Sequence, residues 1–109
     1  MQRDEVVIQD IINAARLVIE FIQGLDQENF ISDRKTRSAV LYQLTVIGEA
    51  VKRLSKEFRA NNSEIPWTLI AGMRDNLIHG YDLVDWDEVW KTSTVDVPDL
   101  LAKVDSSRR

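Results

Sequence analysis

The chain has 109 residues, 44% of them hydrophobic and 29% charged, and its formal net charge is −4. This length and composition are typical of a single globular domain, 1–109, and argue against a disordered chain. The absence of cysteine excludes disulfides, thiolate zinc sites and cysteine nucleophiles, and with one histidine as well we expect no metal and no cofactor.

The first segment is predicted to be helical. Its opening residues, MQRDEVVIQD, are charged and lack the apolar part of a secretion signal. No apolar run approaches the roughly 18 residues of a membrane span, so we expect a cytoplasmic protein without membrane contact. Apolar residues recur at every third or fourth position, which predicts an amphipathic helix ending near Gly24: Ile8, Ile11, Ile12, Ala15, Val18, Ile19 and Ile22.

Two further helices are predicted in the middle of the chain. The stretch GLDQENFISD is polar and turn-rich, and Phe30 within it is expected to fill a gap in the core. Asp33 is a candidate N-cap for a helix that runs to about Arg59. After the loop RANNSEIP, a third helix is expected from Pro66 or Trp67 to about Ile78, with Gly80 in the left-handed position that ends it.

The C-terminal part is also predicted to be helical. Asp85 and Glu88 have capping-box spacing and would open a short helix, and Pro98 starts or kinks a last helical stretch. The three tryptophans are expected to be core or interface anchors: Trp67, Trp86 and Trp90. Because no segment alternates with period two, the predicted fold is an all-α, up-down bundle of four to five helices.

Positive charge is concentrated in the second predicted helix. The stretch 34–59 has a net charge of +5, which leaves −9 for the remaining residues. Lys52, Lys56 and Arg59 have i, i+4, i+7 spacing, which would align them on one face of a helix. This face is either simply solvated or a local phosphate-facing stripe.

The single histidine, His79, lies near the end of the third predicted helix. One interpretation is structural, because an imidazolium interacts favourably with the negative end of a helix dipole. Asp75, four residues earlier, would share its helical face and could orient the ring. Arg74 is five residues away, about 140° round a straight helix, so the two side chains would not converge within one chain.

Histidine and arginine together suit metal-free cleavage of a phosphodiester. One imidazole takes the proton of a ribose 2′-hydroxyl, another protonates the leaving oxygen, and a guanidinium stabilises the charged phosphate. One histidine cannot fill both proton-transfer roles at once. A symmetric homodimer would supply two copies of His79 and of Arg74 at a shared cleft.

The same residues carry a family resemblance. Arg74, His79 and Tyr81, spaced as R-x4-H-x-Y, resemble the motif of the HEPN superfamily, and the tyrosine narrows the match to the HepT-like toxins of the MNT–HepT toxin–antitoxin systems. The flanking segments IGEAVKRLS and IPWTLIAGMRDNLIHGYDLVDWDEVW, and the later VPDLL, also resemble that family. The resemblance thus covers nearly the whole chain.

The resemblance implies a type II toxin: an all-helical homodimer that acts as a metal-independent ribonuclease. Arg74 and His79 match the catalytic positions, and Asp75 matches the polar residue that follows the arginine. Tyr81 matches the tyrosine that a partner nucleotidyltransferase antitoxin modifies with adenylate, which would inhibit by bulk and negative charge. RNA contacts are then expected from Lys52, Arg53, Lys56 and Asn76.

Other roles are open for some of these residues. Tyr81 could be a packing aromatic, and Glu49 could assist catalysis or form a hydrogen bond at a dimer seam where Gly48 allows close helix approach. A different class of function is a non-catalytic helical partner that positions a nucleotidyltransferase or binds nucleotides. A third is a degenerate toxin that has kept the motif and lost its substrate channel. Arg74 and His79 together favour the enzyme, because a scaffold needs no titrating group beside a guanidinium.

Overall fold

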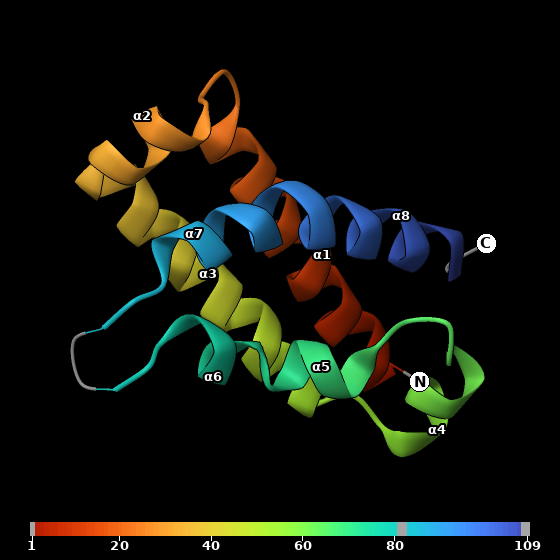
Figure 1. Cartoon of the computed structure of the whole chain (residues 1–109). Helices are drawn as coiled ribbons and strands as arrows, with labels where there is room; N and C mark the ends of the chain where they lie inside the picture. The colour runs from red at the N-terminus through yellow and green to blue at the C-terminus, as the bar shows by residue number, and fades with distance from the viewer. Residues whose placement is uncertain (1, 81–82, 108–109) are drawn as a thin grey trace.

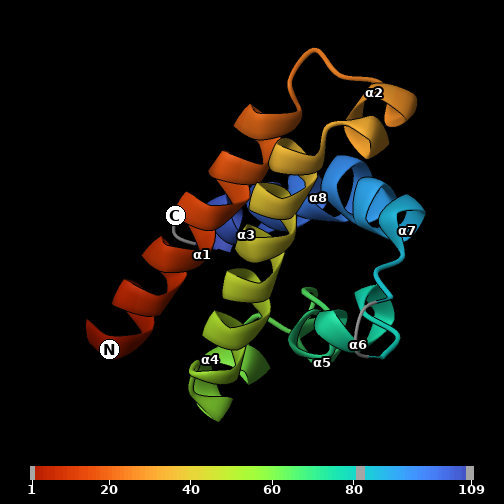
Figure 2. The same cartoon turned by 90° about the vertical axis from the view of Figure 1, so that its left-hand side faces the viewer.

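The computed structural model describes residues 2–80 and 83–107, and it confirms the all-α class (Figure 1). Helices α1 (Gln2–Ile22) and α3 (Arg34–Lys52) run antiparallel and side by side (Figure 2). Their apolar faces form the centre of the core, as the three- and four-residue spacing of the sequence predicts. No helix among the described residues is both long and apolar enough to cross a membrane.

A second layer crosses this pair. It consists of α7 (Trp86–Lys91), a π-helical turn, η1 (Thr92–Asp96), and α8 (Val97–Ser107), which follow one another as one rod (Figure 1). Pro98 was predicted to start or kink the last helical stretch, and it lies in the first turn of α8, directly after the π-helical turn η1. Proline has no N–H to donate to the preceding turn, and the ladder widens there, with the Val97 amide donating to the Thr92 carbonyl.

Two short helices correct the predicted boundaries. The segment predicted as a turn-rich loop contains α2 (Gln27–Ser32), whose first turn is capped by the Asp26 carboxylate. The second predicted helix does not reach Arg59, because it ends at Lys52 and α4 (Lys56–Asn61) begins separately. The predicted cap at Asp33 is confirmed, since its carboxylate accepts the Thr36 amide hydrogen at 3.1 Å.

The third predicted helix is also divided, into α5 (Trp67–Ala71) and α6 (Met73–Leu77). Gly72 lies between them with φ −91° and ψ 7°, a flattened conformation that interrupts the helical ladder. Gly48 allows α5 to approach α3, because a Cβ there would lie 3.3 Å from the Ile70 carbonyl oxygen. The close approach expected of Gly48 at a dimer seam therefore occurs within one chain.

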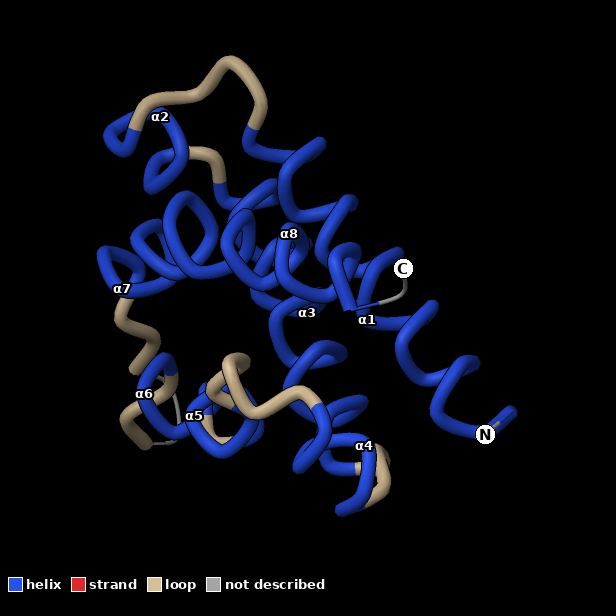
Figure 3. Tube along the Cα trace, turned by 90° about the vertical axis from the view of Figure 1, so that its right-hand side faces the viewer, coloured by secondary structure: helices blue, strands red, loops and turns tan. Residues whose placement is uncertain are grey.

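Aromatic residues join the layers. Phe30 of α2 is fully buried and contacts Trp90 and Trp86, with ring centroids 5.2 and 6.5 Å apart. Trp67 is buried against Phe58, so all three tryptophans pack against the core as predicted. The tube view shows the resulting arrangement, in which short loops connect helices at the rim of the molecule (Figure 3).

The break between α3 and α4 depends on a contact from the start of the chain. The Asp4 carboxylate is buried and accepts hydrogen bonds from the Ser55 amide at 2.9 Å and the Ser55 hydroxyl at 2.7 Å. Ser55 in turn caps α4 by accepting the Phe58 amide hydrogen. The Ser55 hydrogen bonds lower the pKa of Asp4 below its ordinary value of 3.8.

We expect Asp4→Ala to lower the free energy of unfolding by about 2 kcal/mol, because it removes two hydrogen bonds to a carboxylate. The lowered pKa means that the charged form stabilises the fold above pH 3.8, and that this stabilisation is lost as the pH falls through the folded-state pKa. Urea unfolding followed by circular dichroism should show a flatter dependence on pH below 4 for Asp4→Asn than for the unaltered protein. Glu5→Gln, an exposed neighbour, should change stability by less than about 0.5 kcal/mol; an equal loss in both variants would contradict this role of Asp4.

Candidate active site

His79 lies on a loop that is closed like a hairpin. Ile78 and Val84 form an antiparallel bridge, the His79 amide donates to the Leu83 carbonyl at 2.7 Å, and the Asp85 amide donates to the Leu77 carbonyl at 2.8 Å. Helix α6 ends at Leu77, and the backbone of Ile78 is extended. The helix therefore ends close to the predicted position, and Gly80 has a positive φ of 118° as predicted, but it lies in the loop rather than directly at the helix end.

Asp85 is the carboxylate that faces His79. Its Oδ2 lies 3.7 Å from Nε2 of the imidazole, an ion pair when the ring is protonated. Its Oδ1 accepts the Glu88 amide hydrogen at 3.0 Å, which confirms the predicted cap of α7 and holds the carboxylate in place. About half of the His79 side chain is exposed, so the ring is oriented from one side and open to solvent on the other.

The structure removes the geometric basis for Asp75 as the orienting group. The sequence argument needed one helix through both residues, and His79 lies beyond the end of α6. No hydrogen bond or ion pair joins Asp75 to His79 in the described part of the chain. Asp85 was recognised from the sequence only as a helix cap, because nothing local indicates that a loop closes six residues back onto the histidine.

Arg74 is exposed on α6, and its charge acts on α3. The pKa of Glu49 is lowered by the hydrogen bond and positive charge of Lys52, with a smaller contribution from Arg74. Lys52 Nζ lies 2.8 Å from Glu49 Oε2, and both side chains are exposed. No hydrogen bond or ion pair joins Arg74 to His79 among the described residues. Arg74 on α6 and His79 just after its end are thus near each other in the chain without direct contact within it.

The predicted basic stripe does not exist as a helix face. The break at 53–55 separates Lys52 from Lys56, and Arg59 turns inward to donate to the Val51 carbonyl at 2.9 Å. Figures 1 and 3 place α4 at the far end of the α5–α6 layer from the loop after α6. Lys56 is therefore remote from the His79 loop of its own chain.

The remaining candidates are placed as follows. Tyr81 lies outside the described residues. Asn76 lines a cavity between α6 and α7, on a surface that neither Arg74 nor His79 lines. Among residues 2–80 and 83–107, no group of three or more histidine, aspartate and glutamate side chains is placed to hold a metal ion.

Comparison with known proteins identifies the family. The family model described as "Ribonuclease HepT-like" matches residues 11–107, which is most of the chain. The chain belongs to the HepT-like ribonuclease family. This confirms the resemblance carried by Arg74, His79 and their flanking segments.

Relatives of similar length support the assignment. A protein of Thermococcus cleftensis named "Probable ribonuclease HepT" is 41% identical over 102 residues, which is 94% of this chain and 93% of the relative. A candidate RNase of Caldanaerobacter subterraneus subsp. tengcongensis, TTE0752, is 40% identical over 97 residues, 89% of this chain and 87% of the relative. No solved structure gives a significant match.

Proposed function

We propose that the protein is a metal-independent endoribonuclease that works as a homodimer, as the toxin of an MNT–HepT-like toxin–antitoxin system. The observation that carries the proposal is His79, an exposed imidazole 3.7 Å from the Asp85 carboxylate that caps α7, in a HepT-like chain that also has Arg74 on the preceding helix. Ribonuclease names among the relatives supply the substrate class.

In the proposed reaction, a ribose 2′-hydroxyl attacks the adjacent phosphorus. One imidazole takes the hydroxyl proton, the bond from phosphorus to the 5′ oxygen breaks, and a second imidazole gives that oxygen a proton. The products are a 2′,3′-cyclic phosphate and a 5′-hydroxyl end. Arg74 stabilises the negative charge that gathers on the phosphate oxygens in the transition state.

The need for two imidazoles supports the homodimer. Leu83, in the His79 loop, is 67% exposed, and a second copy would cover this apolar side chain while bringing the two loops across one cleft. The partner chain would also let Arg74 and His79 from different copies act on one phosphate. Asp75 remains a candidate only as a contact between chains. Lys52, Arg53 and Lys56 remain candidate phosphate contacts along the dimer, and Asn76 a weaker candidate for RNA binding.

Regulation in this proposal acts through Tyr81. A nucleotidyltransferase partner would transfer adenylate from ATP to the phenol oxygen, releasing pyrophosphate. The added phosphate would stand two residues from His79 and repel the RNA backbone. Growth arrest on expression without the partner, relieved by co-expression, is the corresponding phenotype.

Product analysis tests the chemistry directly. We expect the purified protein to cleave single-stranded RNA in excess EDTA and to leave 2′,3′-cyclic phosphate and 5′-hydroxyl ends, read by mass spectrometry. Analytical ultracentrifugation should show a dimer under the assay conditions. Products with 5′-phosphate ends, activity that EDTA abolishes, or an active monomer would each contradict the proposal. Toxicity that is undiminished in His79→Ala would instead favour the non-catalytic nucleotidyltransferase partner.

A further inference from the structure

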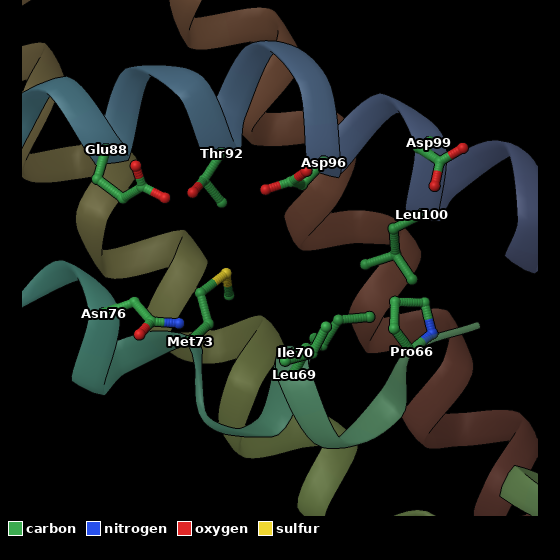
Figure 4. Close-up of a pocket in the computed structure, with 10 residues that line it drawn as sticks. All are labelled: Pro66, Leu69, Ile70, Met73, Asn76, Glu88, Thr92, Asp96, Asp99 and Leu100. Carbon is green, nitrogen blue, oxygen red and sulfur yellow. The ribbon is translucent and has the colours of Figure 1, made fainter.

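A cavity of about 220 Å³ lies between the α5–α6 layer and the rod formed by α7, η1 and α8 (Figure 4). Its apolar lining includes Ile70 and Met73 on the α5–α6 side and Leu100 of α8 on the opposite side. Arg74 and His79 do not line it, so it is separate from the proposed active site. We call it the α6–η1 groove.

Acidic side chains of one rod line the α6–η1 groove: Glu88, Asp96 and Asp99 (Figure 4). Asp99 forms an ion pair with Lys103 at 3.0 Å. Within the described residues, Glu88 and Asp96 have no ion-pair partner. The groove therefore presents uncompensated negative charge beside an apolar lining, which repels RNA phosphates and attracts a cation.

The hydroxyl of Thr92, a largely buried residue, opens onto the groove and lacks a protein partner in the described part of the chain. Thr92 is only 5% exposed, and its side chain points into the cavity (Figure 4). The neighbouring hydroxyls of Ser93 and Thr94 donate to the carbonyls of Val89 and Trp90, each at 2.8 Å. The Thr92 hydroxyl has no hydrogen-bond partner in the described part of the chain. This hydroxyl is therefore free to form a hydrogen bond with a ligand that enters the groove.

The edge of the groove is apolar and exposed. Leu69, on α5, lines the groove and is 69% exposed. A small cation would leave this side chain in water, whereas a polypeptide lying along the groove would cover it. A ligand that covers Leu69 and also reaches the acidic side chains of the rod must extend along the groove, which favours a polypeptide over a metabolite.

We propose that the α6–η1 groove binds a basic, amphipathic helix of a partner protein. An apolar side chain of the partner would enter between Met73 and Leu100, and its lysine or arginine residues would pair with Glu88 and Asp96. A backbone or side-chain group of the partner would form a hydrogen bond with the Thr92 hydroxyl. RNA does not fit the charge, and in the proposed homodimer the second copy lies at the His79 loop instead.

The test uses the full chain and a synthetic helical peptide of leucine and lysine, about 14 residues long, near the length at which an isolated helix persists in water. Binding is measured by fluorescence anisotropy, and the site is located by NMR amide shifts. We expect binding, with shifts confined to α5, α6, η1 and the start of α8. A peptide of the same pattern with glutamate in place of lysine should not bind.

Two variants define the site. The double variant Glu88→Gln with Asp96→Asn should weaken peptide binding at least about fivefold, and Leu69→Ser should weaken binding as well. The matched control, Glu5→Gln with Glu20→Gln, makes the same change in net charge at exposed positions of α1 and should leave affinity within about twofold. Equal weakening by the control, amide shifts on another face, or amide shifts in the groove when the protein itself dimerises would each overturn the proposal.

Discussion

His79→Ala is expected to lower RNA cleavage by about 10²–10⁴-fold while leaving the fold intact. The loss follows from removing a group that transfers protons in the proposed transition state. The fold should persist because about half of the side chain is exposed and its ion pair with Asp85 is also solvent-accessible. Initial rates on a labelled RNA, with circular dichroism of the same samples, measure both effects.

Arg74→Ala should have a similar effect, about 10²–10³-fold, because the guanidinium stabilises developing negative charge. Arg16→Ala, an exposed arginine on α1, is the matched control and should retain near-normal rates. Mixing the two inactive variants then probes the shared cleft. Because the proposed reaction uses two imidazoles and a mixed dimer contains one His79 and one Arg74, we expect mixing to restore little activity. Substantial recovery would show that a single imidazole suffices. Full activity of either single variant would rule out the proposed site.

Phe30→Ala is expected to lower the free energy of unfolding by about 3–5 kcal/mol, the largest effect on stability that we foresee. Phe30 is fully buried, and its ring contacts both Trp86 and Trp90. Its loss would leave a cavity between α2 and the rod that begins at α7. Urea unfolding followed by tryptophan fluorescence measures the change, since two of the three tryptophans lie beside the deleted ring.

Phe21→Ala serves as the control, because Phe21 is partly exposed on α1 and should lose clearly less. A Phe30→Ala variant destabilised by under about 1 kcal/mol would mean that α2 is not held by this ring. Gln27 of α2 donates a hydrogen bond to the Asp87 carboxylate of α7 at 2.8 Å. If α2 loses its packing in Phe30→Ala, this bond should weaken and the start of α7 should become less ordered. The cap at Asp85, and with it the orientation of His79, would then become less ordered.

The sequence predicted well the features that depend on close neighbours along the chain. The apolar spacing of α1 and α3, the caps at Asp33 and Asp85, and the burial of Phe30 are all present. The apolar face of a helix repeats every three to four residues, and a cap acts within the first turn, so both are visible as short-range patterns in the sequence. The family motif around Arg74 and His79 was likewise readable because its residues are close in sequence.

The errors share a different cause. The break between α3 and α4 depends on Asp4, 51 residues from its partner Ser55. The flattening at Gly72 interrupts a helix whose apolar spacing continues through it. In each place the local pattern favoured a longer helix, and a contact or conformation set by packing ended it. The basic stripe of Lys52, Lys56 and Arg59 was lost with the first of these breaks.

The amino-acid pattern thus determined the helical class, the main apolar faces, several caps and the identity of the candidate catalytic groups. Only the tertiary structure decided that Asp85, rather than Asp75, faces His79, and that Glu88, Thr92 and Asp96 gather over Met73 in one groove. The physical reason is range. Helix propensity and capping act over about one turn, whereas these side chains meet only after loops close and layers pack.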